Sequence, residues 1–167
     1  MSMQKCSKVA LPFLILRKSN RLTIFCIFSA KIALMTKAQY KQQALDYWYG
    51  SSEDDWDTAL KLQENKKYHH ALFFGHLSLE KLFKGKIVDL LNKNPLPIHN
   101  LVKLAKYLKI ELTQEQEKSL EEISSFSLEA RYDSYKLKFY KKATREYCDE
   151  WIQKLERWRL WIKEYKK

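Results

Sequence analysis

Residues 68–92 constrain the fold of this chain more than any other segment. If they form a helix, apolar side chains lie on nearly every side of it: Leu72, Phe73, Phe74, Leu77, Leu79, Leu82, Phe83, Ile87, Val88, Leu90 and Leu91. A helix that is apolar nearly all round must be covered by neighbours on several sides. We therefore predict that this helix forms the middle of a bundle that the other segments surround.

Four further segments carry apolar residues at helical intervals. They span about 37–63, 101–108, 113 to about 125, and 147 to the C-terminus. Two of them begin with a capping box, at 36–39 and 113–116, in which threonine and glutamine side chains bind the free N–H groups of a helix start. Gly50 costs a helix about 1 kcal/mol relative to alanine, which leaves a kink open there. No strand pattern appears, so the sequence predicts an all-α, up-and-down bundle of four to five helices.

Residues 1–34 differ from the rest of the chain. They hold six basic residues and no acidic one, and so supply more than half of the formal net charge of +11. Their apolar runs, 9–16 and 22–30, are shorter than the roughly 20 residues that a membrane span needs, and the basic cluster between them does not fit a signal peptide. We expect Met35 to be the natural start, with residues 1–34 a mis-assigned or disordered leader outside a domain at 35–167.

The cysteines and acidic residues indicate no metal site. Cys6, Cys26 and Cys148 match no metal-ligand spacing, and their odd number is typical of a reducing compartment, so we expect a cytoplasmic protein without cofactor or membrane span. Cys148 falls within a helical pattern and is expected in the core. The acidic group at 53–57 has no second ligand cluster, which favours a solvated helix face. No glycine-rich phosphate loop or nucleophile elbow is present.

The central helix also carries polar residues on one side. At 100° per residue, His69, His76 and Glu80 project within a narrow arc, with Lys84 at its edge. A carboxylate among apolar neighbours must be paired or must shift its pKa. We predict that Arg131 is its partner. Two interpretations stay open: a buried tie between Glu80 and Arg131, or a polar pocket that takes a ligand.

Arg131 belongs to a segment, 128–140, that carries four aromatic residues between two helical patterns. A solvated linker would avoid such bulky groups. We predict a loop that lies flat across the bundle and immobilises Arg131, a residue suited to planar recognition of a carboxylate or phosphate.

Together these residues resemble the HEPN domains, the higher eukaryotes and prokaryotes nucleotide-binding family. The matching stretches are Asp55-Trp56-Asp57-Thr58-Ala59, residues 68–84, Ile98-His99-Asn100-Leu101 and Glu129-Ala130-Arg131-Tyr132-Asp133. The likeness covers nearly everything from about Tyr40 to the C-terminus. Asp133 stands where the family usually has proline, which relaxes the backbone at that point.

The resemblance implies a helical bundle, frequent homodimers and pairing with a minimal nucleotidyltransferase, in some cases as a toxin–antitoxin system. Many members resemble metal-independent ribonucleases, in which an arginine is followed after four to six residues by a histidine that acts as base. Here Arg131 is followed at that spacing by Lys136, Leu137 and Lys138, and all four histidines precede it. The likeness therefore implies a branch with a nucleotide-binding or partner-binding role.

Three functions remain open. The first, which we expect, is a non-catalytic module that binds a nucleotidyltransferase partner and contacts nucleotide or RNA at Arg131, Tyr132, Lys84, His76 and Glu80. The second is a ribonuclease or toxin with a rearranged site, in which His76 or His99 is the base and Arg131 holds phosphate. The third is a purely structural homodimeric bundle.

Overall fold

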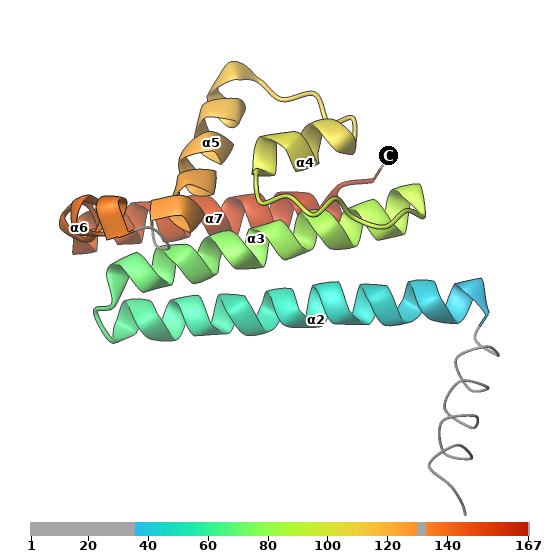
Figure 1. Ribbon diagram of the computed structural model, residues 1–167, viewed down its shortest axis with the longest axis horizontal. Helices are drawn as coiled ribbons and strands as arrows, with labels where there is room; N and C mark the ends of the chain where they lie inside the picture. Colours follow the sequence, from blue (N-terminus) through green and yellow to red (C-terminus); the bar gives the residue numbers. More distant parts are fainter. Residues whose placement is uncertain (1–35, 130–132, 167) are drawn as a thin grey trace, which may run out of the picture. The chain divides into compact units, whose positions relative to one another are not determined.

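The computed structural model describes residues 36–129 and 133–166 of the chain. Within those two stretches the chain forms six helices and no strand, which confirms the all-α bundle (Figure 1). The helices are α2 (Lys37–Glu64), α3 (Tyr68–Leu91), α4 (Leu101–Tyr107), α5 (Gln114–Glu129), α6 (Asp133–Lys142) and α7 (Arg145–Glu164). No helix in the described stretches is both long and apolar enough to cross a membrane.

Helix α3 is the centre of the bundle, as its apolar surface predicts. It packs against each of the other five helices, and Figure 1 shows α2 on one side of it and α4 and α5 on the other. Leu72, Leu79 and Phe83 have no exposed surface. Because neighbours cover α3 all round, polar groups on it are held away from water and must find partners among the surrounding helices.

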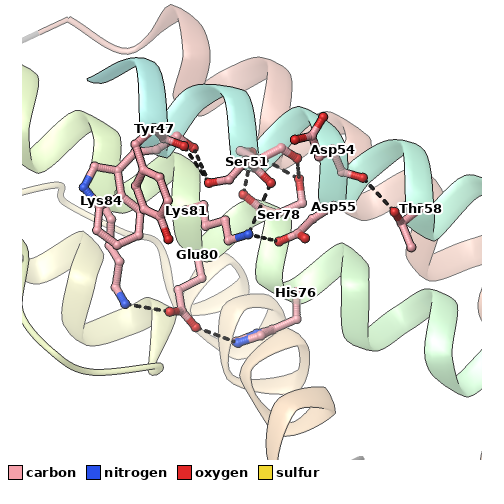
Figure 2. A network of polar contacts seen from close by, with 12 residues as sticks. Tyr47, Ser51, Asp54, Asp55, Thr58, His76, Ser78, Glu80, Lys81 and Lys84 are labelled. Carbon is pink, nitrogen blue, oxygen red and sulfur yellow. Dashed lines mark hydrogen bonds and ion pairs between the residues drawn. The ribbon is translucent and has the colours of Figure 1, made fainter. Parts of the chain in front are cut away.

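Helices α2 and α3 form an antiparallel pair joined by a short turn. α2 runs unbroken through Gly50, so the kink that this glycine allowed is absent. The two helices approach closely at Gly85, where an added Cβ would lie 2.6 Å from Cε1 of Tyr49. The acidic group at 53–57 is not simply solvated, since Asp55 pairs with Lys81 of α3 at 2.7 Å (Figure 2).

Local sequence chemistry sets the helix starts. The capping box at 113–116 is confirmed, because the backbone N–H of Thr113 donates to Gln116 Oε1 at 2.9 Å and that of Gln116 to Thr113 Oγ1 at 3.2 Å. The side chain of Asn100 caps α4 by accepting from the backbone N–H of Lys103 at 2.9 Å. This cap holds the backbone at the start of α4, and so it also restrains His99, the residue immediately before Asn100.

The prediction of a flat loop at 128–140 is wrong. α5 continues to Glu129 and α6 takes up most of the remainder. Phe139 of α6 is buried and stacks on Phe126 of α5 with ring centroids 5.6 Å apart, so an aromatic side chain that suggested a loop instead docks a helix. Residues 133–142 contain no glycine or proline and are rich in lysine, a good helix former. Arg131 and Tyr132 lie outside the described residues.

Cys148 is confirmed as a core residue. It has no exposed surface, and burial, with a contribution from Asp149, raises the pKa of its thiol to about 12. A thiol with so high a pKa is not a nucleophile at neutral pH.

Candidate functional site

The carboxylate of Glu80 is the centre of a group of polar side chains, the Glu80 cluster, formed with His76, Lys84 and His99. Its Oε1 accepts from Lys84 Nζ at 2.7 Å, and its Oε2 lies 3.2 Å from His76 Nε2 and 3.0 Å from His99 Nδ1. Figure 2 shows Glu80 between His76 and Lys84. These three residues are spaced four apart on α3 and so share one side of the helix, whereas His99 comes from the connection before α4.

The Glu80 cluster is closed except at one residue. His76 has no exposed surface, Glu80 is 4% exposed and Lys84 is 7% exposed. The side chain of His99 is 52% exposed. Any ligand from solvent therefore meets this cluster at the imidazole of His99.

His76 is held from two sides. Its Nδ1 lies 3.1 Å from the backbone carbonyl oxygen of Ile123 in α5, and its Nε2 faces the carboxylate of Glu80. Both partners are oxygen atoms, and each engages one of the two ring nitrogens. The ring is therefore held in one orientation and offers no nitrogen to a ligand.

Glu80 is ionised at neutral pH. Burial by itself raises the pKa of this carboxyl, but hydrogen bonds from His76 and Lys84 and their charges outweigh it and lower the pKa to about 2. Lys84 is occupied by this ion pair and also lies 5.4 Å from the centre of the Trp48 ring. The carboxylate thus faces the buried ammonium group of Lys84 and the imidazoles of His76 and His99.

The structure brings together three of the five residues that the sequence predicted for this site, namely His76, Glu80 and Lys84. Arg131 and Tyr132 lie outside the described residues, so the pairing of Arg131 with Glu80 stays a prediction. His69 does not join the cluster, since its ring contacts those of His70 and Tyr140 instead.

His99 is the member of the Glu80 cluster that the sequence did not predict. The sequence suggests it only as an alternative base, because no spacing relates it to the polar side of α3. The available signal was its place directly before Asn100, a residue type that starts helices, which predicts that His99 is held at a helix end rather than in a mobile loop.

A second buried charge, missed in the sequence, lies between α2, α3 and α7. Arg159 of α7 is 2% exposed. Its guanidinium donates to Ser52 Oγ at 3.0 Å, to Ser78 Oγ and to Glu53 Oε2 at 2.9 Å, and lies 4.7 Å from the centre of the Trp56 ring. We call these five residues the Arg159 cluster. The overlooked signal was spacing, because Arg159 is four residues after Leu155 and three before Ile162 on the apolar side of α7.

A groove of about 810 Å³ lies between α5 and α7, and we call it the aromatic groove. Most of the side chains that line it are aromatic or charged: Tyr147, Trp151, Trp158, Trp161, Lys118, Lys154, Arg157, Glu115 and Glu122. Trp158 is anchored by a hydrogen bond from its Nε1 to Ser119 Oγ at 3.1 Å, while Trp161 is 36% exposed. The groove therefore combines a rigid floor with an accessible ring.

Comparison with known families agrees with this architecture. The model of the HEPN domain matches residues 45–165, a range that contains the Glu80 cluster, the Arg159 cluster and the aromatic groove. The chain belongs to the HEPN family. No curated protein and no solved structure matches it. The four stretches that resemble HEPN domains in the sequence all fall inside the matched range, and two of them supply the residues of the Glu80 cluster.

Proposed function

We propose that this HEPN chain is a non-catalytic module that binds a phosphate group of a nucleotide or RNA at His99 and also binds a nucleotidyltransferase partner. One observation carries the ligand part of the proposal: the Glu80 cluster holds a buried lysine and two imidazoles around one carboxylate and meets solvent at a single imidazole, that of His99. Family membership supports a nucleotide-related role in general, and the cluster supplies a specific place for it.

The geometry of His99 suits anion binding. Glu80 accepts a hydrogen bond from Nδ1 and so fixes the plane of the ring. The other nitrogen, Nε2, has no hydrogen-bond partner among the described residues. When Nε2 carries a proton it donates to a phosphate oxygen, and the nearby charge of Lys84 strengthens that contact.

Catalysis needs more than this site offers. Cleavage at a ribose 2′-hydroxyl calls for a base and also for an acid that protonates the leaving oxygen. Within the Glu80 cluster, His76 has no access to solvent and Lys84 is engaged by Glu80. One exposed acid–base group is half of the required pair, which favours binding over turnover.

A second function, ribonuclease activity with His99 as base, has one observation in its favour. A carboxylate on Nδ1 with Nε2 left to accept a proton is the arrangement that orients a general base in hydrolytic enzymes. His76 is not a candidate for that role, because both of its nitrogens are engaged and its ring is fully buried.

The aromatic groove supports the partner part of the proposal. The cores of protein interfaces are enriched in tryptophan, tyrosine and arginine, and the groove presents Trp161 and Arg157 to solvent. Its rim carries both signs of charge, Lys118 and Glu115, which complements a mixed protein surface better than a polyanion. We assign this surface to the nucleotidyltransferase; a second copy of the chain there is the alternative outcome.

Fluorescence anisotropy with a labelled single-stranded RNA, without metal, tests the ligand site. We expect His99→Gln to weaken binding roughly tenfold, the effect of losing one charge-assisted hydrogen bond. Lys93→Gln, which removes an exposed charge from the same connection, is the control and should bind like the unaltered chain. Gel analysis of the same samples should show intact RNA. Cleavage that disappears in His99→Gln would replace binding by the ribonuclease function.

A further inference from the structure

A second cavity lies at the end of the bundle where α2 turns into α3 and where Tyr140 of α6 lies against His69. It has a volume of about 420 Å³, and we call it the basic pocket. Apart from Leu62, the side chains that line it are basic or aromatic: Lys66, Lys67, His69, His70, Phe74 and Tyr140. No acidic residue is among the described side chains that line it, unlike the aromatic groove. The pocket is separate from the Glu80 cluster, because His69 and Glu80 are eleven residues apart on α3, about 16 Å along its axis.

The charges of the two lysines in the basic pocket are not neutralised by described residues. Neither Lys66 nor Lys67 has a side-chain hydrogen bond or ion pair with a described residue. Elsewhere in the bundle lysines are commonly neutralised, for example Lys61 by Asp57 and Lys106 by Glu117. The side chain of Lys67 also does not cap α3, and no acid occupies the first turn of that helix, so the partial positive charge of the helix start adds to the field of the pocket.

Aromatic rings stand beside these charges. The rings of His69 and His70 lie 3.9 Å apart, and the ring of Tyr140 meets that of His69 edge-on at 5.1 Å. Tyr140 is 65% exposed and so offers most of its surface to a ligand. Cations that hold a backbone phosphate, next to a ring on which a base stacks, are the recurring parts of single-strand recognition.

We propose that the basic pocket binds single-stranded RNA, with a phosphate on Lys66, Lys67 and His70 and a base stacked on Tyr140. The cavity is large enough for about one nucleotide. The inference goes beyond the proposed function in naming a second contact site and a polynucleotide ligand, and it rests on that function only in sharing RNA as ligand. Since about 16 Å separates the two sites along α3, a mononucleotide does not fill both.

The test is RNA affinity as a function of salt, measured by anisotropy with a labelled oligouridine of about ten nucleotides. The variant is Lys66→Gln with Lys67→Gln, and its matched control is Lys103→Gln with Lys109→Gln, which removes the same charge from exposed lysines around α4. We expect the pocket variant to lose roughly tenfold or more in affinity, and its slope of log K against log salt to fall by roughly 1 to 2. The control should keep the original slope.

Tyr140→Ala separates stacking from charge. We expect this substitution to lower the affinity for RNA several-fold and to leave the salt slope unchanged, since stacking does not release counterions. Thermal unfolding of each variant verifies that the fold is intact. Equal affinity in the pocket variant and its control would overturn the inference, as would equally tight binding of oligoglutamate, which has charge but no bases.

The outcome also separates this inference from the proposed function. If only His99→Gln weakens RNA binding, the ligand site at His99 stands and the basic pocket is excluded. If only the pocket variant weakens it, the basic pocket stands and the site at His99 is excluded. An unaltered chain that binds neither the RNA nor a mononucleotide overturns both, whereas one that binds a mononucleotide alone overturns only the basic pocket.

Discussion

The Glu80 cluster and the Arg159 cluster both hold a charge inside the bundle, yet they differ in what reaches solvent. Arg159 is surrounded by Ser52, Ser78 and Glu53 and faces the ring of Trp56. Burial lowers the pKa of its guanidinium, and Glu53 offsets part of that effect. Glu80 instead connects the buried side chains of His76 and Lys84 to the half-exposed ring of His99.

The comparison shows that a buried charge is not by itself evidence of a site. The Arg159 cluster links α2, α3 and α7 and reaches solvent at Glu53, whose side chain is 52% exposed. Both carboxylate oxygens of Glu53 are already taken, one by Arg159 and the other by Lys163 at 2.9 Å, which is the arrangement of a structural tie. The Glu80 cluster ends in an imidazole nitrogen that has no partner among the described residues. Remaining hydrogen-bonding capacity at the surface, rather than burial of charge, distinguishes the candidate functional site from its structural counterpart.

The largest effect on stability is expected from Arg159→Ala. The change leaves Ser52, Ser78 and Glu53 without their common donor, and removing one member of a buried ionic group typically costs about 3–5 kcal/mol. Denaturant unfolding measures it. Arg157→Ala, exposed and two residues away on the same helix, should change the unfolding free energy by less than about 0.5 kcal/mol. A loss below about 1 kcal/mol for Arg159→Ala would contradict the structural role.

Glu80→Gln should destabilise the chain somewhat less, by about 3 kcal/mol, because Lys84 and His76 lose their counter-charge but His99 keeps its access to water. The same unfolding assay checks it. A double-mutant cycle with Arg131→Ala tests the predicted pairing of Arg131 with Glu80. Coupling near zero would exclude that pair, whereas coupling between Glu80→Gln and His99→Gln is expected from the observed hydrogen bond.

The stability of the chain should fall in acid through Glu80. Its folded pKa of about 2 is below the ordinary value of 4.5, so the carboxylate stabilises the fold above about pH 4.5 and loses this contribution as the pH falls toward 2. Between pH 7 and pH 3 the loss attributable to Glu80 is about 2 kcal/mol. The difference in unfolding free energy between the unaltered chain and Glu80→Gln should therefore shrink by that amount at pH 3. A difference that is independent of pH would refute the assignment.

The smallest effect on stability is expected from His99→Gln, less than about 1 kcal/mol, because half of this side chain is in water. The same variant is predicted to weaken RNA binding. A small change in unfolding together with a large change in affinity would complete the contrast between the two clusters. A loss of stability as large as that of Arg159→Ala would make His99 a structural residue and remove the distinction.

Features that depend on residues close together in the sequence were predictable. The all-round apolar surface of α3 determines its central position, and the capping box at 113–116 forms the hydrogen bonds that its residue types predict. Glu80 was recognisable as anomalous because a carboxylate on an apolar helix cannot remain unpaired. The helix α6 was missed because the aromatic residues that dock it, such as Phe139, bury against α5 rather than lining a loop.

The sequence by itself determined most of the helical stretches and that Glu80 must find a partner, since these follow from periodicity and from the cost of desolvation. It did not show helix α6 or the burial of Arg159. Tertiary structure alone decided which partner each buried charge receives. Glu80 and His99 are 19 residues apart in the sequence, and His76 and its partner Ile123 are 47 apart. Arg159 and Ser52 are 107 apart. Such distant atoms meet only where helices cross, and close approaches such as that of Gly85 to Tyr49 set the crossing points.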